Sequence, residues 1–286
     1  MKTIEKTNLT KSKSMNTKTF LKTIFKISLG ISLISPLFKS EPAQAFVTAC
    51  SDTNTVTDMS GEANACFITP EMLKVTFYEI GFCTSDPLAT GTFVSTTCSK
   101  SWDNTSGFET DIGQKSFASM TGTTYKVPNA TYEYAYAIMN NTWTYKAQYK
   151  LSGGDTYYTN STNGLVTTTE SEYGEWTDDI SNMSGQETTG LCYDFEASTT
   201  GGTVTAVLAN SSLVTATDQT TCNNATRVVG SVDLTSSVTM DDSVKGYKLN
   251  WQITDMGIGL SNNGGSPSIP YDWRGGPFTP IFTLIK

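Results

Sequence analysis

Residues 131–151 read TYEYAYAIMNNTWTYKAQYKL, and polar and apolar side chains alternate along both halves of this stretch. Alternation with a period of two places one set of side chains on a buried face and the other toward water, as in a β-strand. Asn140 and Asn141 separate the halves, and asparagine tolerates the positive φ of a tight turn. We therefore predict a two-stranded hairpin turning at these two residues. Gly153-Gly154-Asp155 then turns the chain into a third strand at 156–160.

Similar extended patterns recur along the rest of the chain and decide the fold class. Further strands are predicted at 73–82, 93–98, 203–209, 227–234, 244–254 and 278–285. Connections rich in Gly, Asn, Ser and Asp, such as 103–107 and 262–265, separate them, and no helical periodicity persists beyond residue 45. Many short strands of this kind are typical of sandwiches. We predict an all-β fold, a disulfide-linked antiparallel β-sandwich of jelly-roll or Ig-like type.

The N-terminus has the order of an export signal. Lysines precede an apolar run at residues 27–38, and Ala43-Gln44-Ala45 follows it. The apolar run is shorter than the ~20 residues that span a bilayer as a helix, so it fits a cleavable signal helix. We predict residues 1–45 as a signal peptide cleaved after Ala45, with Met15 as the true start. Residues 46–286 then form a single exported β domain, with an acidic loop or subdomain boundary near 162–190; two smaller β domains are the alternative.

A lipoprotein signal is a competing interpretation of the same region. Val47-Thr48-Ala49-Cys50 has the form of a lipobox, in which Cys50 would carry a lipid. Such a box follows the apolar run directly, whereas Lys39, Glu41 and Pro42 intervene here. The spacing therefore favours the cleavable signal and leaves Cys50 available for a disulfide.

The chain has six cysteines, an even number, which in an exported protein predicts three disulfides. Many pairings of six cysteines are open, and proximity along the chain favours Cys50–Cys66, Cys83–Cys98 and Cys192–Cys222. None of the spacings matches a CxxC pattern, so a zinc or iron–sulfur site is not expected.

Charge and composition exclude several classes of function. Without residues 1–45 the chain keeps 11 basic and 25 acidic residues, a net charge of −14, and only two arginines. Nucleic acid is therefore not an expected partner, because phosphate binding uses clustered Lys and Arg. The chain has no histidine, which excludes Ser-His-Asp and Cys-His catalysis and histidine-ligated metals. Carboxylate pairs for glycoside hydrolysis are present, but none stands out, so we predict that the protein is not an enzyme.

An acidic run supplies the candidate metal ligands. Oxygen-rich loops of this kind bind calcium, which accepts six to eight oxygen ligands. The D-x-D-x-D-G spacing of a calcium loop is missing, however, so a solvated acidic loop is the favoured alternative. Calcium is the one cofactor that we leave open. The candidate ligands are Glu170, Glu172, Glu175, Asp178 and Asp179.

Aromatic residues supply the candidate ligand contacts. Those of the stretch 131–151 are predicted to pack in the core, since cross-strand aromatic pairs stabilise sheets, although a sugar-binding platform is the alternative. Aromatic residues in turn-rich segments are better candidates, because loops carry function more often than strands do. These are Trp102, Trp176, Tyr271 and Trp273.

Three functional hypotheses follow. The first is an exported structural or interaction protein for adhesion or assembly, secreted or held at the cell surface, with the periplasm as the alternative location. Its partner would be a protein or a glycan, self-association included. The second is a carbohydrate-binding or calcium-dependent ligand-binding module. The third is an outer-membrane β-barrel. Six cysteines, polar strands and the C-terminal Lys286 argue against it, so we expect no integral membrane protein once the signal is cleaved.

Overall fold

The structure is a computed structural model, and part of the chain is described. The described residues are 45–46, 49–51, 66–113, 119–161, 166–183, 192, 194–199, 201–261 and 272–286. The chain divides into two units, Met1–Glu41 and Pro42–Lys286, and all described residues belong to the second. The predicted signal segment, including the start at Met15, therefore lies outside the described residues except for Ala45.

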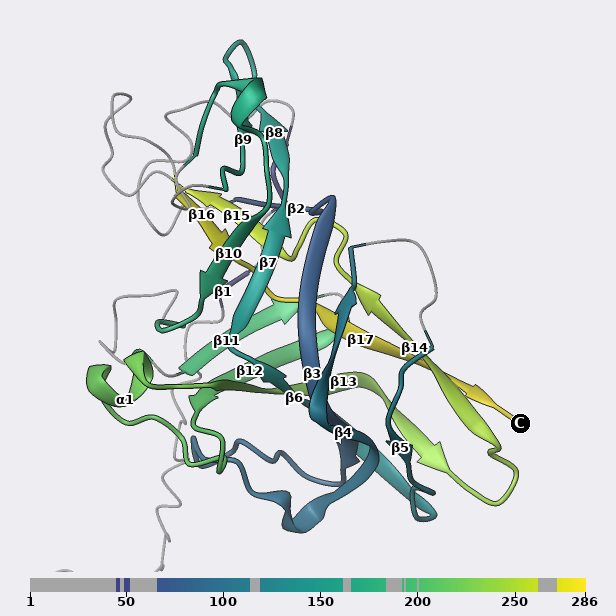
Figure 1. Cartoon of the computed structure of the whole chain (residues 1–286). Helices are drawn as coiled ribbons and strands as arrows, with labels where there is room; N and C mark the ends of the chain where they lie inside the picture. The colour runs from purple at the N-terminus through teal and green to yellow at the C-terminus, as the bar shows by residue number, and fades with distance from the viewer. Residues whose placement is uncertain are drawn as a thin grey trace, which may run out of the picture. The chain divides into compact units, whose positions relative to one another are not determined.

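Almost every described element is a β-strand, which confirms the all-β prediction (Figure 1). One large sheet has the strand order β1-β11-β12-β13-β6-β3-β4-β5, and β7 and β10 extend it beyond β3. All of its pairings are antiparallel except that of β1 with β11. Its strands are β1 (Ala45–Phe46), β3 (Met72–Cys83), β4 (Cys98–Asp111), β5 (Thr123–Thr124), β6 (Ala130–Asn140), β7 (Thr142–Lys146), β10 (Trp176–Asp179), β11 (Asp194–Thr199), β12 (Gly202–Ala209) and β13 (Arg227–Met240).

Three smaller sheets accompany the large one. β14 (Gly246–Gln252) pairs with β17 (Thr279–Ile285), β8 (Gln148–Lys150) pairs with β9 (Thr156–Tyr158), and β15 (Ile258–Ser261) lies between β2 (Cys66–Ile68) and β16 (Asp272–Gly275). The described helical elements are α1 (Gln219–Asn223) and two 3-10 helices, Ser95–Thr97 and Glu170–Glu172.

The β14–β17 sheet packs against one face of the large sheet through aromatic rings. Phe82 of β3 lies 4.6 Å from the ring centroid of Phe282 and 5.4 Å from that of Tyr247. Further along β3, Phe77 stacks on Trp251 at 4.9 Å. Two sheets thus enclose an aromatic core between them, as in a β-sandwich.

The predicted hairpin at residues 131–151 is wrong. β6 and β7 do not pair with each other, because both pair antiparallel with β3 and so run in the same direction. Met139 faces Phe77 and Thr144 faces Lys74. Between these two pairs the chain advances five residues from β6 to β7 but only three along β3. The two extra residues form a bulge.

The chain forms a bulge at Asn140 and Asn141 in place of the expected turn, because the polar groups of the bulge form hydrogen bonds within the protein. Asn141 is buried, and its carbonyl oxygen accepts a hydrogen bond from the Ile180 N–H at 2.9 Å. Its side-chain Nδ2 donates to the Ile180 carbonyl oxygen at 3.2 Å. The chain beyond β10 therefore satisfies the asparagine that a turn would have exposed to water.

A similar bulge explains the other difference among the predicted strands. We predicted a strand at 93–98 and a connection at 103–107, whereas β4 begins at Cys98 and continues through that connection. Glu79 pairs with Asp103 and Phe77 with Phe108, so the turn-forming residues widen the strand without ending it. Gly107 takes a φ of 83° there. The strand after residue 155 is confirmed as β9, which pairs with β8.

The three disulfides are those that proximity favoured. Cys50 is bonded to Cys66, Cys83 to Cys98 and Cys192 to Cys222, and no cysteine is free. The lipoprotein alternative is therefore not supported, since the sulfur of Cys50 is already bonded. Three disulfides indicate an oxidising compartment. Among the described residues, no helix is long and apolar enough to cross a membrane.

Candidate functional site

A bulge in β3 turns two neighbouring side chains away from the sandwich core. Against β6, Phe77 and Glu79 pair with the adjacent residues Met139 and Ile138, so Tyr78 is the extra residue. Phe77 and Ile80 both belong to the main core, whereas Tyr78 packs against a separate cluster on the other face. Bulges redirect side chains in this way next to functional sites, and here the bulge places Glu79 at the edge of a pocket.

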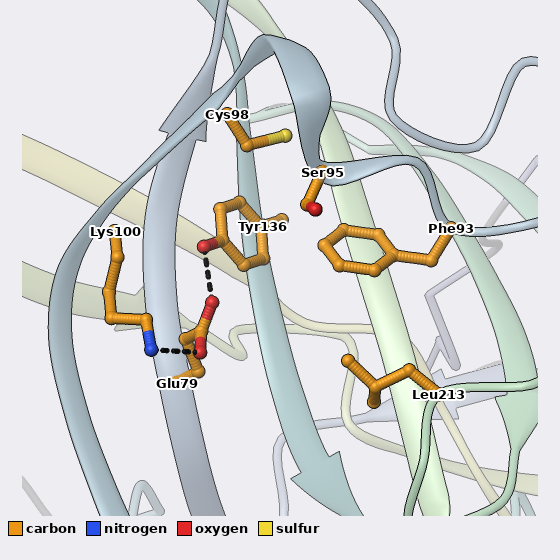
Figure 2. Close-up of a pocket in the computed structure, with 7 residues that line it drawn as sticks. All are labelled: Glu79, Phe93, Ser95, Cys98, Lys100, Tyr136 and Leu213. Carbon is orange, nitrogen blue, oxygen red and sulfur yellow. Dashed lines mark hydrogen bonds and ion pairs between the residues drawn. The ribbon is translucent and has the colours of Figure 1, made fainter.

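The pocket, whose lining side chains are drawn in Figure 2, has a volume of about 370 Å³. It lies on the face of the large sheet opposite β14–β17. Alternation along the strands supports this placement, since Phe82 packs with the β14–β17 residues and its neighbour Cys83 packs with Tyr136. The volume falls at the lower end of the range of small-ligand sites. The lining residues are Glu79, Phe93, Ser95, Cys98, Lys100, Tyr136 and Leu213.

A chain of charged and hydroxyl groups forms the polar side of the pocket. The Tyr136 hydroxyl donates to Glu79 Oε1 at 2.6 Å, and Lys100 Nζ lies 2.7 Å from Glu79 Oε2 (Figure 2). Lys100 also donates to Asp103 Oδ2 at 2.9 Å, and the Tyr125 hydroxyl donates to the same oxygen at 3.1 Å. The Glu79 side chain is 21% exposed and that of Lys100 36%, so a ligand in the pocket can reach both.

The pKa values of three of these groups are shifted further from neutral pH. Burial, followed by the hydrogen bond to Glu79, raises the pKa of Tyr136 far above its ordinary value. Partial burial alone would lower the pKa of Lys100, but the hydrogen bonds to Glu79 and Asp103 outweigh it and raise that pKa. The hydrogen bond from Lys100 lowers the pKa of Asp103. Tyr136 is therefore neutral, Lys100 positive and Asp103 negative near neutral pH.

Two side chains from separate loops form the apolar side of the pocket. The Phe93 ring lies 5.3 Å from that of Tyr136 at an interplanar angle of 45°. Leu213 follows β12 in a tight loop, where its N–H donates to the Asn210 carbonyl oxygen at 2.9 Å. It takes a φ of 62°, a conformation that a bulky residue rarely adopts. Such strain persists only where the surroundings hold it, and it is frequent at ligand sites.

A disulfide closes the loop that carries Phe93 and Ser95. Cys83 and Cys98 are register partners at the ends of β3 and β4, and their bond joins the two ends of the connection between these strands. Within the loop, the Thr84 N–H donates to the Thr97 carbonyl oxygen at 3.0 Å, and the Val94 N–H donates to that of Pro87 at 2.9 Å. The disulfide therefore fixes the base of the loop, and the hydrogen bonds fix the rest of it.

The candidate tryptophans lie in strands, so their predicted placement in loops is wrong. Trp102 belongs to β4, Trp176 to β10 and Trp273 to β16, and all three are buried. Trp176 stacks on Tyr145 at 5.1 Å. Each of these short polar segments pairs with at least one neighbouring strand, and the three rings pack in the main core. Tyr271 lies outside the described residues.

The candidate calcium ligands do not come together. Glu170 and Glu172 belong to a 3-10 helix, and Glu175 pairs with Lys74 at 3.1 Å. Asp178 and Asp179 are successive residues of β10 and so point to opposite faces. In the described part of the chain, no three acidic or cysteine side chains gather as a metal would need. The calcium site thus stays a prediction without geometric support.

The aromatic residues of 131–151 are mostly core residues, as predicted. Tyr132, Tyr136, Trp143 and Tyr145 are buried. Sequence reasoning missed that Tyr136 also lines a pocket with Glu79 and Lys100. One signal was present, since an isolated glycine within a strand, here Gly81, indicates a bulge or a close approach.

Comparisons with known proteins add no family or relative. No protein-family model, curated protein or solved structure matches the chain.

Proposed function

We propose that this protein acts at the cell surface or in the extracellular space as an interaction protein for adhesion or assembly, and not as an enzyme. The observation that carries the proposal is the pocket at Glu79, Lys100 and Tyr136, in which hydrogen-bonded polar groups face an apolar wall. Ligand sites combine apolar lining with a few oriented polar groups in this manner.

The protonation states favour binding over catalysis. A general acid or base works best when its pKa lies near the operating pH. The pKa values of Tyr136 and Lys100 are raised and that of Asp103 is lowered, each away from neutrality. Of these, Tyr136 and Lys100 line the pocket, where they can orient a ligand through hydrogen bonds but do not exchange protons readily with it.

The oxidising compartment supports a location outside the cytoplasm. All six cysteines are paired, and disulfides persist in secreted and surface-exposed proteins. The predicted export signal before Ala45 agrees with that location. From the disulfides and the predicted signal together, we propose that the protein is secreted or displayed at the cell surface.

The second candidate function is a carbohydrate-binding or calcium-dependent ligand-binding module. The pocket supports ligand binding in this second candidate, because a cavity of about 370 Å³ can hold a small ligand or one unit of a larger one. A ligand-binding module is also a means of adhesion, so the two candidates differ mainly in the kind of partner.

Fractionation of the native host tests the location. We expect the mature protein outside the cytoplasm, with Phe46 as its first residue and with faster migration in non-reducing than in reducing electrophoresis. A cytoplasmic, fully reduced protein would contradict the proposal.

Binding to intact cells tests the interaction. Fluorescently labelled, oxidised protein should bind saturably, and Lys100→Met should weaken the binding. Lys248→Met is the control, because Lys248 lies exposed on β14. Equal loss in both variants, or no saturable binding at all, would argue against a role of the pocket in adhesion.

A further inference from the structure

We infer that the pocket at Glu79, Lys100 and Tyr136 binds a neutral, hydroxyl-rich ligand, and that a neutral sugar residue of a glycan is the ligand class. The inference rests on the proposed role as an interaction protein and names the chemistry of its partner. It depends on three features of the pocket, which are its paired charges, its remaining hydrogen-bonding capacity and its apolar wall.

The paired charges select against ionic ligands. Lys100 Nζ lies 2.7 Å from Glu79 Oε2, and both groups line the cavity. A cationic ligand that reached Glu79 would meet the ammonium group of Lys100, and an anionic ligand that reached Lys100 would meet the carboxylate of Glu79. Like charges brought together at a binding site are unfavourable and exclude wrong partners. A neutral polar ligand avoids both conflicts.

The remaining hydrogen-bonding capacity suits hydroxyl groups. A carboxylate can accept about four hydrogen bonds and an ammonium group donates three. Glu79 accepts one from Tyr136 and one from Lys100, and Lys100 donates to Glu79 and Asp103. Acceptor sites on Glu79 and one donor on Lys100 are left for a ligand. A hydroxyl group both donates and accepts, so neighbouring hydroxyls of a sugar can use both.

The apolar wall suits the carbon face of a sugar ring. Phe93 and Leu213 stand across the pocket from Glu79 and Lys100 (Figure 2). The face of an aromatic ring carries partial negative charge, which attracts the weakly positive hydrogens of C–H groups. A pyranose presents C–H groups on its faces and hydroxyls around its rim, so it can contact Phe93 and Glu79 together.

The walls are held in place before a ligand arrives. The Cys83–Cys98 disulfide closes the loop that carries Phe93, and the strained Leu213 is held by its contacts. A site that is already ordered loses less conformational entropy on binding. A single sugar residue makes few contacts, so it benefits strongly from such ordering.

Titration calorimetry on the oxidised protein tests the ligand class. The probes are the neutral sugars glucose, galactose, mannose and N-acetylglucosamine, with glucuronic acid and glucosamine as charged probes of the same ring size; an array of neutral glycans extends the panel. At least one neutral probe should bind, and each charged probe should bind about tenfold more weakly or worse than its neutral counterpart. Preference for a charged probe, or no binding across the neutral probes and the array, would overturn the inference.

Matched variants locate the binding. Glu79→Gln and Lys100→Met should each weaken sugar binding about tenfold or more, since each removes a charge-assisted hydrogen bond to the ligand. Glu175→Gln and Lys74→Met are the controls, because Glu175 and Lys74 form an exposed ion pair of the same chemistry, and Lys74 also lies on β3. Unchanged affinity in the pocket variants, or equal loss in the controls, would place the site elsewhere.

A third variant covers the case in which loss of the ion pair disturbs folding. Leu213→Asn introduces a residue type that tolerates positive φ and removes the apolar side chain from the wall, so it should weaken binding at unchanged secondary structure. Unchanged affinity in this variant would contradict the role of the wall. The two proposals fail separately: a cytoplasmic protein that binds sugar contradicts only the location, and a surface protein that binds cells but no neutral glycan contradicts only the ligand class.

Discussion

The phenol ring of Tyr136 lies directly against the backbone of Gly81. The two residues are register partners in β6 and β3. A Cβ atom at position 81 would come within 2.5 Å of both Tyr136 Cε1 and the Ser99 carbonyl oxygen. An aromatic ring that covers a strand glycine supplies packing that glycine itself lacks. The missing side chain at Gly81 thus lets the Tyr136 hydroxyl reach Glu79.

Gly81→Ala should therefore move the Tyr136 ring and break its hydrogen bond to Glu79. We expect a loss of about 1–3 kcal/mol in the free energy of unfolding, as for other overpacked sites, measured by chemical denaturation. Gly246→Ala is the control, because a Cβ atom there meets nothing within 4 Å, and it should be neutral or slightly stabilising. Equal stability of the two variants would contradict the close contact.

Asn141→Ala should destabilise the bulge between β6 and β7. The substitution leaves the buried carbonyl group of Ile180 without the hydrogen bond from Asn141 Nδ2, at a cost of about 1–3 kcal/mol. Asn129→Ala is the control, since the Asn129 side chain bonds to Asp242 on the exposed surface. If residues 140 and 141 formed an exposed hairpin turn, both variants would lose equally little stability on thermal unfolding.

Asp178→Asn should stabilise the protein in a pH-dependent way. Burial, followed by the charge of Asp179, raises the pKa of Asp178 above its ordinary value. The folded protein then binds this proton more tightly than the unfolded chain, so stability falls as the pH rises from the ordinary value upward. Removing the charge should raise the free energy of unfolding at neutral pH and leave it unchanged below about pH 3.

The measurement is a series of denaturation curves across that pH range. Asp155→Asn serves as the comparison, because Asp155 is exposed in the turn between β8 and β9, where the same charge change is made in contact with water. A gain for Asp178→Asn that is constant with pH would show that burial of the charge is not its cause.

Removing the Cys83–Cys98 disulfide should cost both stability and pocket binding. Closing a loop of this length contributes about 3 kcal/mol in the chain-entropy model, and the loop between these cysteines carries Phe93 and Ser95. The double variant Cys83→Ala/Cys98→Ala should therefore unfold at lower temperature and bind sugar more weakly at a temperature where it is still folded.

The double variant Cys50→Ala/Cys66→Ala separates the two effects. This disulfide closes a loop of nearly the same length, and the described lining residues of the pocket lie outside that loop. We expect a comparable loss of stability with sugar affinity retained. Loss of affinity in both variants would mean that general loosening of the fold, and not the position of the loop, controls binding.

Local patterns predicted several strands and the disulfides of this fold. Alternation with a period of two predicted strands near β3, β12 and β13, because side chains on opposite faces of one strand meet different surroundings whatever strand lies beside it. Proximity predicted all three disulfides, since short loops close most readily. Burial of Tyr132 and Trp143 followed from the same alternation.

Pairing between distant strands could not be predicted in the same way. Asn140-Asn141 suits a tight turn as well as a bulge, and the length of β3 decides between them, because β3 pairs with β6 and β7 in succession. Pairing also drew Trp102, Trp176 and Trp273 into strands. Each of these outcomes depends on residues far away in the sequence.

The sequence by itself determined that this chain is built of strands and that histidine chemistry is absent, and it favoured the pairing of neighbouring cysteines that the structure shows. Only the tertiary structure decided where the pocket lies. Glu79, Lys100 and Tyr136 come from β3, β4 and β6, and no spacing along the chain relates them. A bulge at Tyr78 and the register of three strands bring their side chains together. Register is set by all the pairings of a sheet at once, so it is a property of the folded chain and not of any one segment.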